Sequence, residues 1–445
     1  MRRGGHPRPH WASPELWVAC PLGPYGFEFM SAVHAEIAAR YPVDGIFINR
    51  WAGSGPCWCP YCRAGFRAET GRDLPHGLER PGPERRAWAA WRERRLLALW
   101  DRWRDVVTEA RPGCAVVPNT GPGEIPLAEI VRRAPLLVGD RQARAGATPA
   151  WMAGRHAREY SAMHDGTPAA GLFSVGLEEA YRWKDSVNTP AEIRLWAAGM
   201  IAHGMRPWVC KFSGVLYDRR WLAVVEDIFV RHRAMAPYLV EAESLARVAL
   251  VTSPRAGDHL LGWCQALIEA RLPFEILDAA RLDPALAERF RVLVLPNAAE
   301  LSDAACDAVR GFVARGGRIV ATYETSRYDE TGAARADFGL ADLFGVSAGA
   351  THAGPERNAY LHVEPASDGG VHPVAMGLEH AGRIIAGVRR VEVAPRAARP
   401  PYPLTLIPSY PDLPMEKVYP REEPREPGAI ARDVGPGRVV YFPGA

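Results

Sequence analysis

The stretch Asp44-Gly-Ile-Phe-Ile-Asn49-Arg50-Trp51 is a short apolar run that ends in polar and aromatic side chains. Its unbroken apolar centre is typical of a strand buried on both faces, as parallel strands in α/β proteins are. Residues at the carboxyl end of such a strand point into the mouth of a barrel or the crevice of an open sheet. The sequence therefore predicts that Asn49, Arg50 and Trp51 bind substrate, although Asn49 and Arg50 could instead hydrogen-bond loop backbone.

Three cysteines follow in the loop after this strand, in the run Cys57-Trp-Cys59-Pro-Tyr-Cys62. Thiols at this spacing can converge on one ion, but a closed tetrahedral zinc site needs a fourth protein ligand. The nearest cysteine upstream is Cys20. The remaining cysteines lie singly in apolar surroundings and are typical of small core residues: Cys114, Cys210, Cys264 and Cys306.

These motifs resemble those of the glycoside hydrolase family 42 β-galactosidases and their trimerisation-domain relatives. The matching segments are Cys20-Pro-Leu-Gly-Pro-Tyr25, Ala39-Arg-Tyr41, the strand to Asn49 and the run from Cys57 to Arg67. Taken alone, the cysteine run would also fit a generic zinc knuckle. The resemblance implies a structural zinc ion, because four thiolates leave no open position for water. The implied ligands are Cys20, Cys57, Cys59 and Cys62.

The strand end departs from the pattern of that family, in which Asn is followed by the Glu that acts as general acid/base. Here Arg50 follows Asn49, and an arginine does not give up a proton near neutral pH. The resemblance is therefore nearest to uncharacterised hypothetical glycosidases of the group that keep the zinc loop. Their substrate cannot be carried over to this chain.

Length and composition set broad limits. The chain has 445 residues, enough for two or three domains with large cores. Fifty-four Lys and Arg against 51 Asp and Glu give a net charge of +3, and the scattered arginines do not indicate nucleic-acid binding. No secretory signal or membrane span is predicted. One thiol cluster among isolated cysteines favours a reducing compartment, so we expect a cytoplasmic protein.

Strands and helices alternate through the first half of the chain, which predicts a parallel sheet. We interpret residues 1–240 as the C-terminal part of a (β/α)8 TIM barrel, and we expect the tryptophans of its long helix to pack on the barrel. Helices are predicted over 28–41, 84–110, 126–134, 151–164 and 190–204, and strands over 44–49, 114–119, 135–140, 170–176 and 207–212.

Five strands are fewer than the eight of a complete barrel. By the family resemblance, the chain starts after the first three βα units, which predicts an N-terminally truncated sequence with exposed strand edges. The chain stops just after Val439-Val-Tyr-Phe-Pro-Gly-Ala445, which suggests a clipped C-terminus as well.

The alternation restarts at Ala246 and predicts a doubly wound α/β unit. Residues 245–348 resemble the trimerisation domain of the same hydrolases, a class I amidotransferase-like (flavodoxin-like) fold, which implies a homotrimer. Amidotransferase chemistry is not expected, because Cys306 lies inside a predicted helix rather than at a strand-to-helix elbow. Residues 349–445 are proline-rich with short alternating runs and predict a small β-rich region.

Glycoside hydrolysis usually needs two carboxyl groups that flank the scissile bond. In the resembled family the nucleophile is a Glu at the end of the seventh barrel strand, upstream of an Arg-Leu-Trp helix. Here Glu178 and Glu179 precede Arg194-Leu-Trp196 and occupy that region. Adjacent glutamates point in different directions, so at most one is catalytic and Glu178 is preferred. The alternative is a solvated pair in a loop.

The general acid has to come from another strand end. Asp140, at the end of the strand over 135–140, is the best substitute, and Asp185 is second. Arg141 and Arg144 beside Asp140 favour the ionised carboxylate and make it a poor proton donor, so Asp140 could bind sugar hydroxyls instead. Two further residues are expected around the same mouth: Asn119 and Lys211.

Aromatic residues near these positions fit a sugar platform, because a flat ring face packs on pyranose C–H groups, or they could serve as lids. They are Trp51, Tyr181 and Trp183. The sequence thus predicts a glycoside hydrolase-like protein that acts on an O-glycosidic bond, β-galactosidase-like but of unknown sugar. A catalytically degenerate carbohydrate-binding or assembly protein is the main alternative, since Arg50 replaces the usual acid. A non-glycosidic barrel hydrolase is a weaker one.

Overall fold

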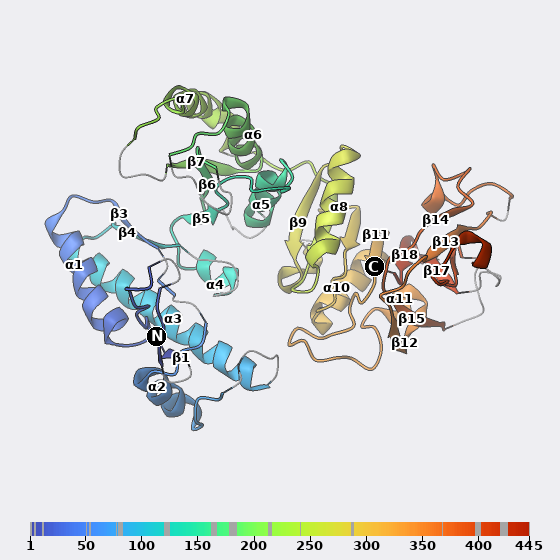
Figure 1. The fold of residues 1–445 in the computed structure, drawn as a ribbon, viewed down its shortest axis with the longest axis horizontal. Helices are drawn as coiled ribbons and strands as arrows, with labels where there is room; N and C mark the ends of the chain where they lie inside the picture. Colours follow the sequence, from blue (N-terminus) through green and yellow to red (C-terminus); the bar gives the residue numbers. More distant parts are fainter. Residues whose placement is uncertain are drawn as a thin grey trace. The chain divides into compact units, whose positions relative to one another are not determined.

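The chain divides into two compact units, Met1–Glu241 and Ala242–Ala445, each of which is described by itself (Figure 1). In the described part of the chain, no helix has the length and apolar character that crossing a membrane requires. The computed structural model describes residues 2–3, 6–10, 13–49, 51–52, 55–76, 78, 83–119, 125–161, 167–177, 185–211, 216–240, 242–285, 289–366, 368–396, 402–418 and 426–444.

Helices and strands alternate in the first unit, as the sequence predicts. Its strands are β1 (Arg2–Arg3), β2 (His6–Pro7), β3 (Gly45–Ile48), β4 (Ala115–Pro118), β5 (Leu137–Asp140), β6 (Ala169–Ser174) and β7 (Met205–Cys210). Its helices are η1 (Tyr25–Met30), α1 (Ser31–Arg40), α2 (Pro60–Thr70), α3 (Pro83–Ala110), α4 (Leu127–Val131), α5 (Met152–Ser161), α6 (Pro190–Ile201) and α7 (Leu222–Leu239).

Two helices were not anticipated. Helix α7 follows the last strand of the unit, and α2 begins inside the cysteine run that the sequence suggested was a loop. Pro60 occupies the first turn of α2 and Gly71 ends it with a φ of 68°. Proline at the start and glycine just past the end are the usual helix boundaries, so this signal was present in the sequence.

The parallel strands form two sheets, β3-β4 and β5-β6-β7. Ile48 of β3 is buried, whereas Phe47 faces the other way and is 42% exposed. The Phe47 ring contacts Trp208 of β7 edge to face, with 4.8 Å between centroids. The first and last of these parallel strands therefore meet across a common interior, as part of a barrel would.

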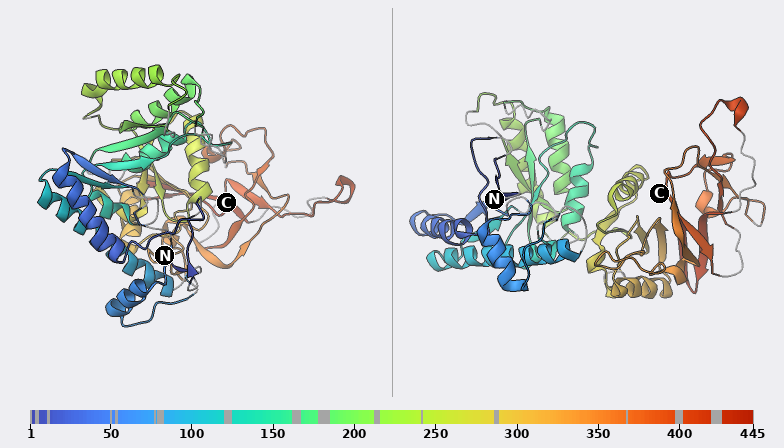
Figure 2. Two further views of the ribbon diagram at one scale, coloured as in Figure 1. Left: turned by 60° about the vertical axis from the view of Figure 1, so that its left-hand side comes forward. Right: turned by 60° about the horizontal axis from the view of Figure 1, so that its bottom comes forward.

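Helices α1 and α3 pack side by side (Figure 2). Trp103 of α3 donates a hydrogen bond to the carbonyl oxygen of Gly26 at 3.0 Å. A Cβ at Gly26 would lie 2.0 Å from the carbonyl oxygen of Pro21, so only glycine fits there. The α3 tryptophans are core residues, because all are at most 4% exposed: Trp88, Trp91, Trp100 and Trp103.

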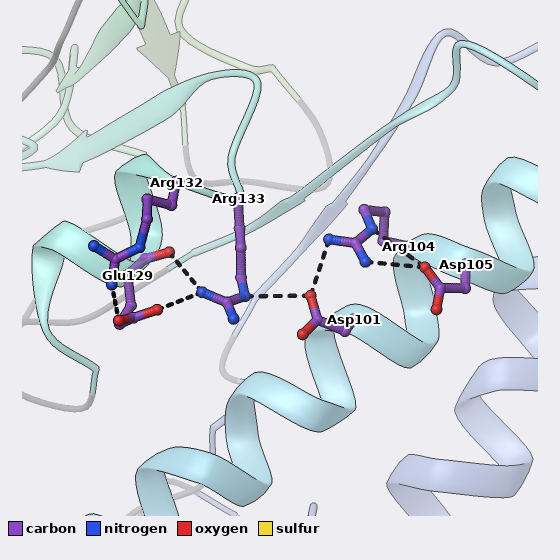
Figure 3. A network of polar contacts seen from close by, with 6 residues as sticks. All are labelled: Asp101, Arg104, Asp105, Glu129, Arg132 and Arg133. Atoms are coloured by element: carbon purple, nitrogen blue, oxygen red, sulfur yellow. Dashed lines mark hydrogen bonds and ion pairs between the residues drawn. The ribbon is translucent and has the colours of Figure 1, made fainter.

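A network of ion pairs joins α3 to the segment that leads into β5 (Figure 3). Arg133, just after α4, lies 3.2 Å from Asp101 of α3 and also pairs with Glu129 of α4. Arg104 pairs with Asp101 at 2.9 Å and with Asp105 at 3.0 Å, and Arg132 pairs with Glu129. Exposed pairs each contribute only about 0–1 kcal/mol, and the pair between Arg133 and Asp101 links the end of α4 to α3.

The second unit is also an α/β structure. Its strands are β8 (Val248–Thr252), β9 (Phe274–Asp278), β10 (Val292–Leu295), β11 (Arg318–Thr322), β12 (Val346–Ala353), β13 (Tyr360–Val363), β14 (Arg383–Ile385), β15 (Arg390–Pro395), β16 (Leu404–Ile407), β17 (Pro427–Val434) and β18 (Gly437–Phe442). Its helices are α8 (Gly257–Glu269), η2 (Ala279–Arg281), α10 (Asp303–Ala314), α11 (Ala341–Phe344), η3 (Pro373–Ala375) and η4 (Met415–Lys417).

The main sheet of this unit has nine strands in the order β14-β13-β16-β17-β18-β11-β10-β8-β9. Strands β9, β8, β10, β11 and β18 run parallel, and β17 turns back antiparallel to β18. Most strands after residue 349 thus extend the α/β sheet, whereas the sequence suggested a small region of their own. Only β12 and β15 form a separate pair within the described residues.

Candidate functional site

Three predicted site residues meet at the carboxyl ends of neighbouring strands. The side-chain amide of Asn119, after β4, donates hydrogen bonds to Asn49 Oδ1 after β3, at 3.1 Å, and to Asp140 Oδ2 at the end of β5, at 3.2 Å. The backbone N–H of Asn119 donates to the carbonyl oxygen of Ile48 at 2.7 Å. Asn49 and Asp140 are exposed and Asn119 is half-buried, so their remaining oxygens can accept hydrogen bonds from a ligand.

The aromatic pair Phe47 and Trp208 belongs to the same interior, and sequence reasoning missed it. Side chains alternate along a strand, so Phe47 shares its face with Asn49. Trp208 contacts Phe47 from β7. The run Gly45–Ile48 is apolar throughout, so only the general rule that residues i and i+2 of a strand share a face could have placed Phe47 beside Asn49.

Trp51, by contrast, lies in the core. It is 6% exposed, and its ring packs edge to face on Trp100 and Trp103, at centroid distances of 5.9 and 5.6 Å. We therefore leave Trp51 out of the ligand-facing set, because a buried ring offers no face to a sugar. The sequence placed it at the strand end correctly but could not show that the chain turns inward there.

Lys211 follows β7 and is half-buried. In the sheet order β5-β6-β7 it lies two strands from Asp140, a separation of ~10 Å at the usual strand spacing. Lys211 is thus at the predicted edge of the sheet, on the far side of β6 from the asparagine pair.

After β6, residues 175–177 are hydrogen-bonded to residues 186 and 188, and we call this paired segment the neck. Leu177 N–H donates to Ser186 Oγ at 3.0 Å. Asn188 donates through its backbone N–H to Val175 O and through its side chain to Gly176 O, both at 2.8 Å. The chain therefore leaves and returns at the carboxyl end of β6, beside Asp140. Four predicted residues, Glu178, Glu179, Tyr181 and Trp183, lie outside the described residues, as does Arg50.

The arginine near Asp140 has another partner. Arg144 forms two hydrogen bonds with the carboxylate of Glu192, at 2.9 and 3.1 Å. Glu192 lies in the first turn of α6, where Thr189 caps the helix. The sequence suggested that Arg144 would favour the ionised carboxylate of Asp140. It could not show that Arg144 pairs with Glu192, which is 48 positions away. Asp185, the second choice for the acid, is exposed beside the neck.

The four predicted metal ligands come together in one cluster. The sulfur atoms of Cys20, Cys57, Cys59 and Cys62 all lie within 4.8 Å of one another. The sulfur atoms of Cys20 and Cys62 lie 3.5 Å apart, and the four cysteines form no disulfide bond in the described part of the chain. A tetrahedral zinc ion with Zn–S bonds of ~2.3 Å would place its ligands ~3.8 Å apart. The donor set and its size therefore fit a metal ion.

The crowding of these thiols changes their ionisation. Hydrogen bonds to Cys57 and Cys59 raise the pKa of the Cys20 thiol, and the bond to Cys20 raises the pKa of Cys62. The hydrogen bond from Cys20 lowers the pKa of Cys59 to about 6. Four thiolates at these distances repel one another, so a cation is needed to hold all of them ionised. The N-terminus of α2 at Cys59 also favours negative charge.

No protein-family model and no curated protein matches the sequence. Its fold does match solved structures. A β-galactosidase from Bacillus circulans sp. alkalophilus is 15% identical, with a TM-score of 0.76 over 96% of this chain and 70% of that protein. A catalytic mutant of a GH42 β-galactosidase from G. stearothermophilus is 14% identical, with a TM-score of 0.69 over 96% and 69%. The α-L-fucosidase isoenzyme 2 from Paenibacillus thiaminolyticus is 19% identical, with a TM-score of 0.69 over 98% and 63%. At these identities the likeness concerns the fold: the chain is an α/β structure with parallel sheets, folded like the GH42 β-galactosidases.

Proposed function

We propose that this protein is a glycoside hydrolase that cleaves an O-glycosidic bond and binds its sugar at the carboxyl ends of β3 to β7. The observation that supports this most is the hydrogen-bonded set Asn49, Asn119 and Asp140, which lies where barrel enzymes of this kind place their sites. The solved structures of the same fold include β-galactosidases and a fucosidase.

We assign the role of nucleophile to a carboxylate that follows β6, with Glu178 preferred over Glu179. The neck at Leu177 holds the start of that segment beside β5, which ends in Asp140. Adjacent strands lie ~4.8 Å apart, and glycosidases use carboxyl pairs separated by ~5–9.5 Å. We propose Asp140 as the second carboxyl group or as a residue that binds sugar hydroxyls.

The sugar is held by polar groups on one side and aromatic rings on the other. Asn49 and Asn119 supply amide groups that suit vicinal hydroxyls. Phe47 and Trp208 supply apolar rings for the C–H face of a pyranose. Lys211, Tyr181, Trp183 and Arg50 complete the mouth in this proposal.

The four-cysteine cluster is proposed to hold a structural zinc ion. When bound, the ion supplies cross-linking rather than chemistry, because four thiolates leave no open coordination position. The ligands join Cys20, before η1, to the segment from Cys57 to Cys62, which follows β3 and enters the first turn of α2. The proposed zinc ion would thus fix the segment that carries Arg50 and Trp51. We further propose a cytoplasmic homotrimer, from the resemblance of residues 245–348.

One observation favours a binding protein that has lost catalysis. Among the described residues that end β3 to β7, Asp140 is the one carboxylate, and it already accepts a hydrogen bond from Asn119. A lone carboxylate surrounded by amides suits sugar binding better than bond cleavage. This alternative predicts sugar affinity without turnover.

A panel of aryl α- and β-glycosides separates the two functions. The glycosidase proposal predicts release of the aryl alcohol from one sugar configuration, with saturation kinetics. Calorimetric binding of the same sugar by a folded, metal-loaded protein that releases no product would favour the binding alternative. A folded protein that shows no turnover and no sugar binding would exclude both the glycosidase function and the binding function.

A further inference from the structure

We propose that the second unit holds a binding site for a small uncharged ring molecule that carries a hydroxyl group. The site is a cavity of about 350 Å³, within the size range of small-molecule pockets. It does not depend on the glycosidase proposal, because it lies wholly within the second unit. The residues that carry the argument are His259, Trp263, Thr322, Glu356, Arg390 and Phe442.

The cavity lies at the carboxyl ends of two adjacent parallel strands. Thr322 ends β11, Phe442 ends β18, and the two residues are register partners. Helix α8 contributes His259 and Trp263 from its first two turns. Open α/β sheets bind ligands outside the carboxyl ends of their strands. The fold therefore opens this cavity at the edge where a ligand site is expected.

A strained turn shapes the wall. Tyr323, directly after Thr322, has a φ of 53°, in the left-handed region that bulky side chains rarely adopt. Its backbone N–H donates to Phe442 O at 2.8 Å, and its carbonyl oxygen accepts from Tyr441 Oη at 2.5 Å. Its ring stacks on His259, 5.8 Å between centroids. Such strain persists where surrounding bonds enforce it, and it concentrates at ligand sites.

The charges in the wall balance. Glu356 and Arg390 face each other, and Arg390 also pairs with Glu426 at 2.6 Å. Burial lowers the pKa of His259, so its imidazole is neutral at pH 7. The opposite charges of Glu356 and Arg390 cancel in the lining of the cavity, which favours an uncharged ligand.

Glu356 has capacity left to accept a hydrogen bond. Its side chain is 15% exposed, and its recorded ion pair, from Oε1 to Arg390 Nε, is 3.6 Å long. That distance exceeds a hydrogen bond, and Arg390 Nε has no hydrogen-bond partner within the described structure. A carboxylate that is largely buried is stabilised by accepting a hydrogen bond, and the hydroxyl group of a ligand can donate that bond.

The rest of the wall is apolar and selects a ring. Trp263 and Phe442 offer aromatic surface, and Leu361 and Leu406 line the cavity as well. A free sugar would leave most of its hydroxyl groups without partners against these walls. A phenol, with one apolar ring and one hydroxyl group, matches both the apolar wall and the Glu356 carboxylate.

Calorimetric titration of the full chain with phenol, anisole and galactose tests the proposal. Phenol is expected to bind with one saturable site, at least about tenfold more tightly than anisole, which lacks the hydroxyl donor. Trp263→Ala should weaken phenol binding about tenfold or more. Trp17→Ala, which replaces a tryptophan that is 63% exposed in the first unit, should leave it unchanged. Glu356→Ala should abolish the preference for phenol over anisole.

Three results would overturn the proposal: no saturable binding of phenol, tighter binding of galactose than of phenol, or unchanged phenol affinity in a folded Trp263→Ala variant. Circular dichroism of each variant shows whether it has folded. If Trp263→Ala does not fold, the ratio of phenol to anisole affinity in Glu356→Ala decides, and an unchanged ratio contradicts the proposal.

Discussion

Asn119 donates a hydrogen bond to Asp140 at 3.2 Å, and this bond joins two parallel sheets that share no backbone ladder among the described residues. Asn119 follows β4 in the first sheet, and Asp140 ends β5 in the second. The same amide reaches Asn49. Three strand ends are thus held together by one side chain, which makes Asn119 the centre of the proposed sugar site.

Replacing Asn119 should harm function more than stability. Asn119→Ala removes two partly exposed hydrogen bonds, each worth about 0.5–1.5 kcal/mol. We expect kcat/KM on the best aryl glycoside to fall at least about tenfold, because Asn49 and Asp140 lose their common partner. Gln265→Ala, which removes an exposed amide from α8, should leave turnover unchanged. Turnover equal to the wild type in Asn119→Ala would remove Asn119 from the site.

Loss of one cluster thiol should release the metal. Cys62 is 2% exposed and lies within 4.8 Å of the other three sulfurs. We expect elemental analysis to find one zinc per chain in the wild type, and little in Cys62→Ser. Cys114→Ala, a change at an isolated cysteine of the same unit, should retain the metal. Zinc content that is equal in both variants would contradict the assignment.

Removing the zinc should also lower stability. A chelator should reduce the thermal midpoint of the wild type, since metal binding to the folded state adds to its free energy of unfolding. The midpoint of Cys62→Ser should not respond to the chelator. A chelator effect of equal size in Cys62→Ser would place the metal elsewhere.

Trp51 should behave as a core residue. Its ring is 6% exposed and packs on Trp100 and Trp103, so Trp51→Ala should lower the free energy of unfolding by about 3–5 kcal/mol. Trp17→Ala, at a position that is 63% exposed, should change it by less than about 0.5 kcal/mol. Denaturant unfolding measures both. A stable Trp51→Ala variant with weakened sugar binding would instead restore Trp51 as a sugar platform.

Stability should fall as the pH drops below neutral, partly through His203. Burial first, and then the charge of Arg158, lower the pKa of His203 from 6.5 to about 4. The unfolded chain therefore binds the extra proton between these pH values, so the free energy of unfolding decreases as pH falls from 6.5 toward 4. The loss is at most about 3 kcal/mol.

His203→Gln removes the imidazole that takes up this proton. The free energy of unfolding of this variant should therefore change less between pH 6.5 and 4, as denaturant midpoints at several pH values will show. His6→Gln, at an exposed position, is the matched control. An identical slope in His203→Gln and the wild type would show that His203 is not responsible.

The strands and the cysteine site were predictable because their signals are local. The run Gly45–Ile48 is apolar and ends in polar residues, and three of the four thiols lie close in sequence. Asn49, Asn119 and Asp140 were each identified from the end of a strand. That they form one hydrogen-bonded set follows from the parallel arrangement, which brings the carboxyl ends of strands to one edge.

Other features depend on contacts between distant residues. The inward turn of Trp51 depends on α3, and the pairing of Arg144 with Glu192 depends on the approach of α6. The insertion of β18 beside β11 joins residues more than a hundred positions apart, such as Ile319 and Val439. No local pattern encodes such partners, so the sequence suggested a separate β-rich region instead.

The most direct test of the account is the kcat/KM of Glu178→Gln on the aryl glycoside that the wild type cleaves best. Glu179→Gln tests the adjacent glutamate in the same assay, and Glu36→Gln, at an exposed position on α1, is the control. With folding and zinc content unchanged, we predict that Glu178→Gln loses at least about a thousandfold in kcat/KM, since the carboxylate that attacks the sugar is gone. Full activity in both Glu178→Gln and Glu179→Gln would contradict the claim that a carboxylate after β6 performs the hydrolysis.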